Sequence, residues 1–95
     1  MIYIYKMHAG MLGTDETFWS TEKVDEWEYA VDHAESFGNE IDEDDEWLEG
    51  EPECWLEGTV TTLQELDKHL GSILRGNERE EDLVADIAKA GVILT

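Results

Sequence analysis

The chain opens with MIYIYKMH, a segment in which isoleucine and tyrosine alternate. In an extended chain the isoleucines lie on one face and the tyrosines on the other, which is the period-2 pattern of a β-strand. We expect this strand to be central or well covered. The next segment, AGMLGTDETFW, is interrupted by Gly10 and Gly13. It is typical of a loop that returns to the core at Phe18 and Trp19.

An amphipathic helix is expected within STEKVDEWEYAVDHAESFG. Ser20 or Thr21 can cap its N-terminus, with Glu22 in the first turn, and Gly38 suits the position after its last residue. Carboxylates surround the rest of the cylinder. The apolar residues recur at steps of three and four, which places them in one stripe on a helix: Val24, Trp27, Val31 and Ala34.

Residues 39–51 form an acidic connection to ECWLEGTV, residues 53–60, which is typical of a strand. We expect Trp47 and Leu48 to pair with this strand as a hairpin that turns around Gly50 to Pro52.

Two further helices follow. Thr62 with Glu65 forms a capping box before the first, which is expected to end before Gly76. Asn77 with Glu80 repeats the start signal before the second. The final VILT favours a short strand beside the first strand.

A chain of 95 residues can bury one core without metals or disulfides but is too short for two. The sequence therefore predicts a single acidic α+β domain over residues 1–95, with about three helices packed on a three- or four-stranded sheet. The predicted core consists of Ile2, Ile4, Val24, Trp27, Val31, Leu63, Leu66, Leu70, Ile73, Leu83, Val84 and Ile87. Trp19 is also expected to be buried, whereas Trp47 or Trp55 is expected at the margin of the acidic surface.

The single Cys54 cannot form an internal disulfide, and no basic segment followed by an apolar run marks a signal peptide. No segment approaches the roughly 20 apolar residues that span a bilayer. Anionic lipid would repel a chain whose net charge is -19. We expect a cytoplasmic protein with no membrane role, located in the host cell cytoplasm if a phage encodes it.

The negative charge is concentrated in the middle of the chain. Residues 1–14 have a net charge of +1, residues 15–57 carry 18 acids against Lys23 and have a net charge of -17, and residues 58–95 have a net charge of -3. So high a density of like charge destabilises a compact fold, which indicates an unusual solvent or a partner. An adaptation to a halophilic solvent should cover all three segments, so the asymmetry favours a partner.

Metal binding and catalysis have little support in the sequence. Asp42, Asp44 and Glu46 have the alternate spacing of a calcium loop, but Trp47 stands where its sharp turn needs glycine. The histidines are scattered, acidic surroundings would raise the pKa of the single thiol, and GxSxG, HExxH and phosphate-binding glycine motifs do not occur. We expect no enzyme, no catalytic residue, no metal site and no cofactor.

Direct binding to nucleic acid is not expected, because the net charge has the wrong sign. Phosphate contacts require Lys and Arg, and the chain has 6 of these against 25 acids. A folded surface of carboxylates can instead occupy the basic groove of a protein that binds DNA or RNA. A helix of roughly 17 residues is about 25 Å long. At one charge per about 1.7 Å, duplex DNA carries about 15 phosphates over that length. Six acids on the predicted helix and ten in residues 39–58 come to 16.

In size and in two acidic segments, WSTEKVDEWEYAVDHAES and NEIDEDDEWLEGEPE, the chain resembles the small acidic DNA-mimic inhibitors of phages and mobile elements. The resemblance is one of charge and size and carries no family motif. It implies an anti-restriction or anti-CRISPR inhibitor whose partner is a basic nucleic-acid-binding protein or a nuclease complex. A homodimer stays open. So do two alternatives: an immunity protein or antitoxin that binds a cationic nuclease, and an acidic halophilic domain.

The predicted partner-binding surface lies within residues 22–57. Its members are carboxylates with one indole: Glu22, Asp25, Glu26, Glu28, Asp32, Glu35, Asp42, Glu43, Asp44, Asp45, Glu46, Trp47, Glu49, Glu51 and Glu53.

Added salt should stabilise this chain. Between 0.1 and 1 M salt the screening length falls from about 10 Å to about 3 Å, which weakens the repulsion among carboxylates. We expect the melting temperature to rise by a few degrees over this range, in calorimetry without added metal. A chain that is unfolded below molar salt would favour the halophilic alternative.

Overall fold

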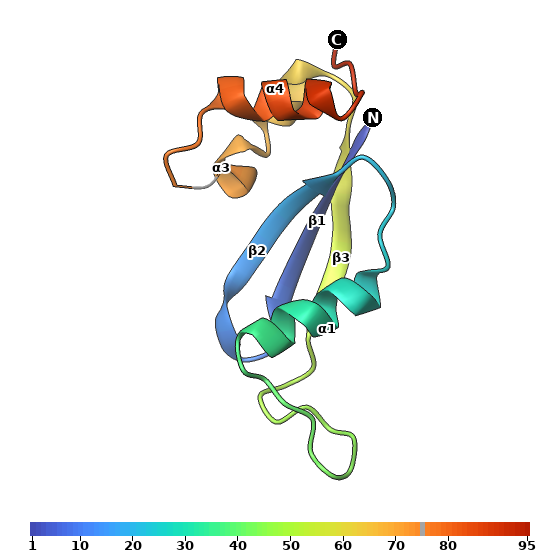
Figure 1. Ribbon diagram of the computed structural model, residues 1–95, viewed down its shortest axis with the longest axis vertical. Coiled ribbons are helices and arrows are strands. Elements are labelled where there is room, and N and C mark those ends of the chain that lie inside the picture. Colours follow the sequence, from blue (N-terminus) through green and yellow to red (C-terminus); the bar gives the residue numbers. More distant parts are fainter. Residues whose placement is uncertain (75) are drawn as a thin grey trace.

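Figure 1 shows a computed structural model that describes residues 1–74 and 76–95, with the backbone alone for residues 12–14. The three strands form one antiparallel sheet in the order β2-β1-β3. The predicted mixed α+β class is confirmed. In chain order the elements are β1 (Ile2–Ala9), β2 (Leu12–Ser20), α1 (Glu26–Ser36), β3 (Glu53–Val60), α2 (Leu63–Asp67), α3 (Leu70–Ile73) and α4 (Glu80–Lys89).

β1 is the central strand, as its apolar alternation predicts. Ile4 lies opposite Trp19 of β2 on one side and opposite Gly58 of β3 on the other. The segment predicted as a loop is instead β2, so that prediction is wrong. The turn occupies only residues 10 and 11, and Gly10 has a φ of 78°, a conformation that costs glycine little. Backbone pairing with β1 supplies the hydrogen bonds that make a strand of this polar segment.

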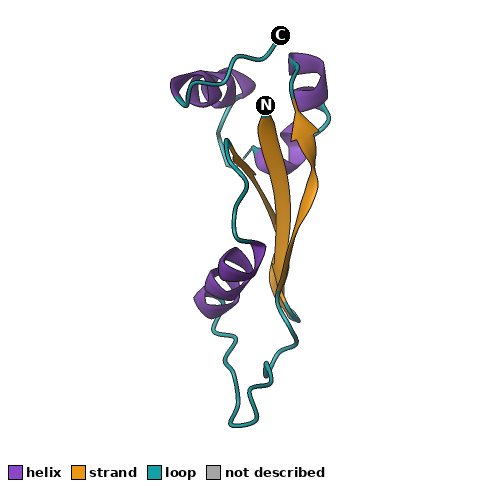
Figure 2. Cartoon of the chain, turned by 90° about the vertical axis from the view of Figure 1, so that its right-hand side faces the viewer, coloured by secondary structure: helices purple, strands orange, loops and turns teal. Residues whose placement is uncertain are grey.

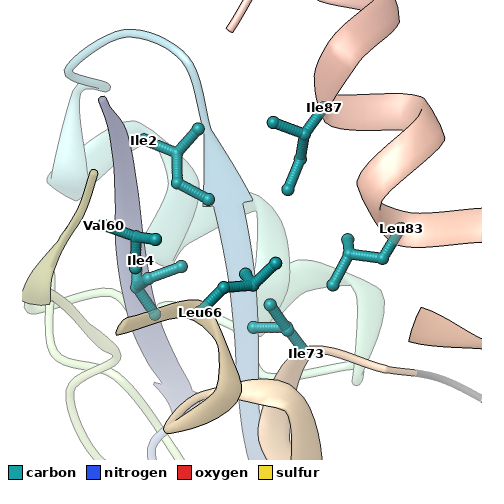
Figure 3. Packing of buried hydrophobic residues seen from close by; sticks show 7 residues of the cluster. All are labelled: Ile2, Ile4, Val60, Leu66, Ile73, Leu83 and Ile87. Atoms are coloured by element: carbon teal, nitrogen blue, oxygen red, sulfur yellow. The ribbon is translucent and has the colours of Figure 1, made fainter. Parts of the chain in front are cut away.

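The hydrophobic core lies at the end of the sheet that carries both termini, where α2, α3 and α4 gather (Figure 1). Trp19, Leu70 and Val84 are partly buried against it. Most of the predicted core positions are confirmed. Figure 3 shows its buried residues pointing toward one another from strands and helices: Ile2, Ile4, Val60, Leu66, Ile73, Leu83 and Ile87.

Three predictions fail around this core. The second predicted helix is divided into α2 and α3, and the second piece contains Gly71, a weak helix former. Leu63 is 42% exposed rather than buried. The terminal VILT is not a strand: the N–H of Thr95 donates to the carbonyl of Thr61 at 3.4 Å, so the tail lies beside the start of α2.

α1 begins at Glu26, later than predicted, because Asp25 rather than Ser20 or Thr21 is its N-terminal cap. The Asp25 carboxylate accepts a hydrogen bond from the N–H of Glu28 at 3.1 Å. Before the helix, the N–H of Val24 donates to the hydroxyl of Tyr5 at 3.2 Å. This contact holds the connection against the sheet and leaves the first predicted turn non-helical.

The face that α1 buries also differs from the predicted stripe. It consists of Ala30, His33 and Ala34, whereas Trp27 is 53% exposed. The small alanines let the helix approach a sheet surface that is already filled by aromatic rings. Phe18 stacks on Tyr5 with centroids 5.4 Å apart and on Tyr29 of α1 at 5.1 Å. His33 also reaches β2, with Nδ1 3.3 Å from Oε2 of Glu16. Gly38 follows the helix with a φ of 82°, as predicted.

Two alanine substitutions test this arrangement. Leu66→Ala should lower the free energy of unfolding by about 2–5 kcal/mol, because it removes a fully buried side chain from the core. Trp27→Ala should cost about 1 kcal/mol or less, since half of that ring is already in water. Urea titration followed by circular dichroism measures both. A larger loss of stability for Trp27→Ala would instead support the predicted stripe, in which Trp27 is buried.

Candidate acidic interface

The acidic segment forms one end of an elongated molecule. The chain measures 50 × 26 × 20 Å, and α1 with the loop that follows it lies at the end opposite the termini in both views (Figures 1 and 2). We call this end, residues 26–53, the acidic pole. The predicted binding residue Glu22 lies outside it, because it follows Ser20, which pairs with Tyr3 near the N-terminus. Of the predicted binding residues, Asp42 and Trp47 are half-buried and the other members are exposed.

The loop of the acidic pole, residues 39–52, is held at its base by the side chain of Asn39, which is 1% exposed. Its amide nitrogen donates to the carbonyl of Ala9 at 3.1 Å and to that of Gly50 at 3.0 Å. Its amide oxygen accepts from the N–H of Glu49 at 3.1 Å. One side chain therefore joins the two ends of the loop to the end of β1.

The loop also contacts the β1–β2 turn through the backbone. The N–H of Met11 donates to the carbonyl of Glu49. At Gly10 a Cβ atom would lie 2.4 Å from the carbonyl oxygens of both Glu49 and Gly50. Only glycine permits this approach, so the loop and the turn form one unit.

Within the loop, Asp42 organises a tight turn. Its carboxylate accepts from the N–H groups of Asp44 and Glu46, both at 2.9 Å. The N–H of Asp42 donates to the carbonyl of Glu46 at 2.8 Å, and Asp45 has a φ of 61°. The Asp42 carboxylate, which was predicted to bind a partner, is thus occupied inside the loop, while residues 43–46 are exposed.

The predicted hairpin of Trp47 and Leu48 with residues 53–60 is wrong. β3 pairs with β1, and Trp47 forms an isolated bridge with Ile41 across the tight turn. The bridge arises because the hydrogen bonds of Asp42 reverse the chain between these two residues.

The reversed loop brings Trp47 to Trp27 of α1, with ring centroids 6.4 Å apart and planes at 77°. Two hollows adjoin this pair and share Trp27 and Glu51. The first, of about 430 Å³, is lined by Trp27, Ile41, Asp45, Glu46, Trp47 and Glu51. The second, of about 380 Å³, is lined by Glu26, Trp27, Ala30, Glu51, Pro52, Glu53, Cys54 and Trp55.

Large apolar side chains are exposed among the carboxylates. Ile41 is 50% exposed and Leu48 is 58% exposed on the loop, and Met11 is 80% exposed at the adjoining turn. Tyr29 and Phe37 of the α1 region are also exposed. Gathered exposed apolar groups of this kind are typical of surfaces that contact another protein.

Two titratable groups near the second hollow, His8 and Cys54, have shifted pKa values. The Glu53 carboxylate, 3.1 Å from Nε2 of His8, raises the pKa of that imidazole. Burial, with a further contribution from Glu26, raises the pKa of the Cys54 thiol to about 11. The predicted direction of the thiol pKa is confirmed, and at neutral pH this thiol is protonated and a poor nucleophile.

Within the described residues, no group of three or more His, Cys, Asp or Glu side chains is placed to hold a metal ion. The same part of the chain has no helix with the length and apolar character needed to span a membrane.

The sequence predicts the charge of this site but not the role of Asn39 or the exposed position of Trp27. Nothing in the sequence distinguishes Asn39 from an ordinary polar residue after a helix, because its hydrogen-bond partners lie far away along the chain or belong to the backbone. The outward position of Trp27 was missed because periodicity assigns aromatic residues to the core.

No protein-family model, curated protein or solved structure matches the chain.

The Asn39 contacts predict a large effect from a small substitution. Asn39→Ala removes three hydrogen bonds, one of them to the buried carbonyl of Ala9, so it should lower the free energy of unfolding by about 2 kcal/mol or more. Asn39→Asp should lower the free energy of unfolding further, because a carboxylate oxygen would then face the carbonyl oxygens of Ala9 and Gly50. Glu43→Ala, in an exposed position of the same loop, is the control and should change stability by less than about 0.5 kcal/mol. Equal effects of Asn39→Ala and Glu43→Ala in urea titrations would contradict this role.

Proposed function

We propose that the acidic pole binds the positively charged nucleic-acid groove of another protein and competes with DNA or RNA for it. On this proposal the chain is a non-enzymatic inhibitor of a nuclease or defence complex, of the anti-restriction or anti-CRISPR kind. It makes no direct contact with nucleic acid and acts in the cytoplasm, in the host cell if a phage encodes it.

The observation that carries the proposal is the segregation of charge in space. Residues 15–57 hold a net charge of -17 out of -19, and most of them belong to α1 and its loop at one end of the molecule (Figure 1). The opposite end has a mixed surface, with Lys68, Arg79 and Lys89 near its acids. Solvent adaptation offers no reason for such a division, whereas a basic groove does.

The second support is the fixed shape of the charged loop. Asn39 closes its base, and Asp42 folds its tip. A loop that is ordered before binding loses less conformational entropy when it docks. The repulsion among its carboxylates, which the fold opposes, would be relieved when a cationic surface approaches.

The third support is the mixture of charge with exposed apolar groups. Charge alone gives fast, salt-sensitive encounters, while buried aromatic and aliphatic contacts slow dissociation. Ile41, Trp27 and Leu48 provide such contacts. This mixture favours a protein partner over small cations.

The proposal can be tested by capture from cells. The bait is the wild-type chain beside a loop variant in which five carboxylates become amides: Asp42→Asn, Glu43→Gln, Asp44→Asn, Asp45→Asn and Glu46→Gln. The asparagine at position 42 retains an acceptor for the turn, and asparagine at position 45 tolerates a positive φ. The matched control neutralises five exposed acids at the other end: Glu78→Gln, Glu80→Gln, Glu81→Gln, Asp82→Asn and Asp86→Asn.

We expect the captured partner to bind DNA or RNA, and excess nucleic acid to displace the wild-type chain. The loop variant should bind at least about tenfold more weakly, a loss of roughly 1.4 kcal/mol, and the control variant should bind nearly as well as wild type. Partners without nucleic-acid function, or equal loss in both variants, would refute the proposal. Simultaneous binding of the chain and DNA to the partner would instead support the immunity-type alternative, with docking beside the groove.

A further inference from the structure

Trp27 and Trp47 form two walls of the larger hollow at the acidic pole and come from different parts of the chain. Trp27 lies in the first turn of α1, and Trp47 is carried by the loop. We propose that this hollow binds the guanidinium group of an arginine side chain of the partner protein. The inference rests on the proposed function for the source of that arginine, but the class of ligand can be tested on this chain alone.

The two rings meet edge to face and line the same hollow. Their centroids are 6.4 Å apart and their planes make an angle of 77°, so the rings form a corner rather than a stack. A cation over the face of an indole is attracted by its π-electrons, and tryptophan gives the strongest such attraction among the aromatic side chains. Trp27 is 53% exposed, which leaves part of its ring accessible.

The other residues that line the hollow favour a positively charged ligand. Asp45, Glu46 and Glu51 border the hollow, whose volume is about 430 Å³, and no basic side chain among the described residues lines it. In the described part of the chain, none of the ion pairs within 4.0 Å involves these three carboxylates. The hollow thus combines unpaired negative charge with aromatic surface, and it repels anions.

Arginine fits this combination better than lysine. The guanidinium is planar, stacks on aromatic rings and donates two parallel hydrogen bonds to one carboxylate. It is also less strongly hydrated than an ammonium, so it loses less on entering a hollow that is partly apolar. Proteins that grip phosphate backbones present arginine side chains in their grooves, so a partner of the proposed kind would supply this group.

The loop fold makes the hollow before the ligand arrives. The backbone bridge between Ile41 and Trp47 positions the main chain that carries the second ring, and Asp42 forms the turn between them. Glu51 lies beyond Gly50, whose carbonyl accepts from Asn39. The residues that line the hollow are therefore placed by hydrogen bonds inside this chain.

Binding can be measured with small probes on the full chain. N-acetyl-arginine amide is titrated while the indole N–H signals of the four tryptophans are followed by NMR. The matched probes are the citrulline analogue, which is neutral and has the same shape, N-acetyl-lysine amide and its trimethylated form. We expect saturable shifts of Trp27 and Trp47 with a dissociation constant on the order of 1–10 mM, no shift with citrulline, and binding of lysine at least fivefold weaker.

Variants locate the site. Trp47→Ala and Glu51→Gln should each weaken arginine binding at least fivefold. Trp55→Ala removes an indole that lines only the second hollow and should leave arginine binding unchanged. Glu51→Gln keeps size and shape, so it serves if Trp47→Ala disturbs the loop, and the remaining NMR signals report whether the fold is intact.

The outcomes separate this inference from the proposed function. Absence of arginine binding, equal binding of citrulline, tighter binding of trimethyl-lysine, or shifts confined to Trp19 and Trp55 would each overturn the arginine site. The proposed function would survive any of these results if DNA still displaced the chain from its partner. Arginine binding at Trp27 and Trp47 without any DNA-competing partner would support the site and refute the function.

Discussion

The acidic pole depends on one buried side-chain amide. Asn39 donates to the end of β1 and to the far end of its own loop, and it accepts from the residue before that end. Without these bonds the repulsion among the carboxylates between residues 40 and 51 would favour opening of the loop at its base. The three hydrogen bonds, each with a net value of about 1 kcal/mol, oppose a repulsion that is spread over exposed charges and screened by water.

The fold places the hydrophobic core and the acidic pole at opposite ends of the molecule. The buried aliphatic residues of the core cluster lie where α2, α3 and α4 meet the sheet (Figure 3), and the densest group of carboxylates lies on α1 and the loop that follows it. β1 connects the two regions, because Ile2 and Ile4 belong to the core while Ala9, at its other end, accepts from Asn39. The core can therefore offset the cost of the charged end without being interrupted by it. Aromatic stacking of Tyr5, Phe18 and Tyr29 fills the region between them.

The sequence predicts those parts of the molecule that follow from local pattern. Alternation identified β1, Thr62 was recognised as the cap of α2, and the leucine and isoleucine spacings located most of the core. β2 was not predicted as a strand, because its polar composition is typical of a loop. Its pairing with β1 makes it a strand. Trp27 was placed in the core because periodicity does not reveal that alanines, rather than large side chains, fit under α1. The charge of the candidate site could be counted, whereas its hollows depend on a chain reversal that no periodicity encodes.

The closed base of the loop also bears on how such a chain can change. Asn39 and Gly50 are joined by a hydrogen bond of 3.0 Å, so the ten residues between them leave the domain and return at nearly the same point. Their length and composition can vary without moving α1 or β3, provided that the two end residues and Gly10 are kept. Loop closure costs little more for a longer segment, since the entropy grows only with the logarithm of its length. The scaffold and its charged tip can therefore diversify at different rates, and one framework can present tips suited to different targets.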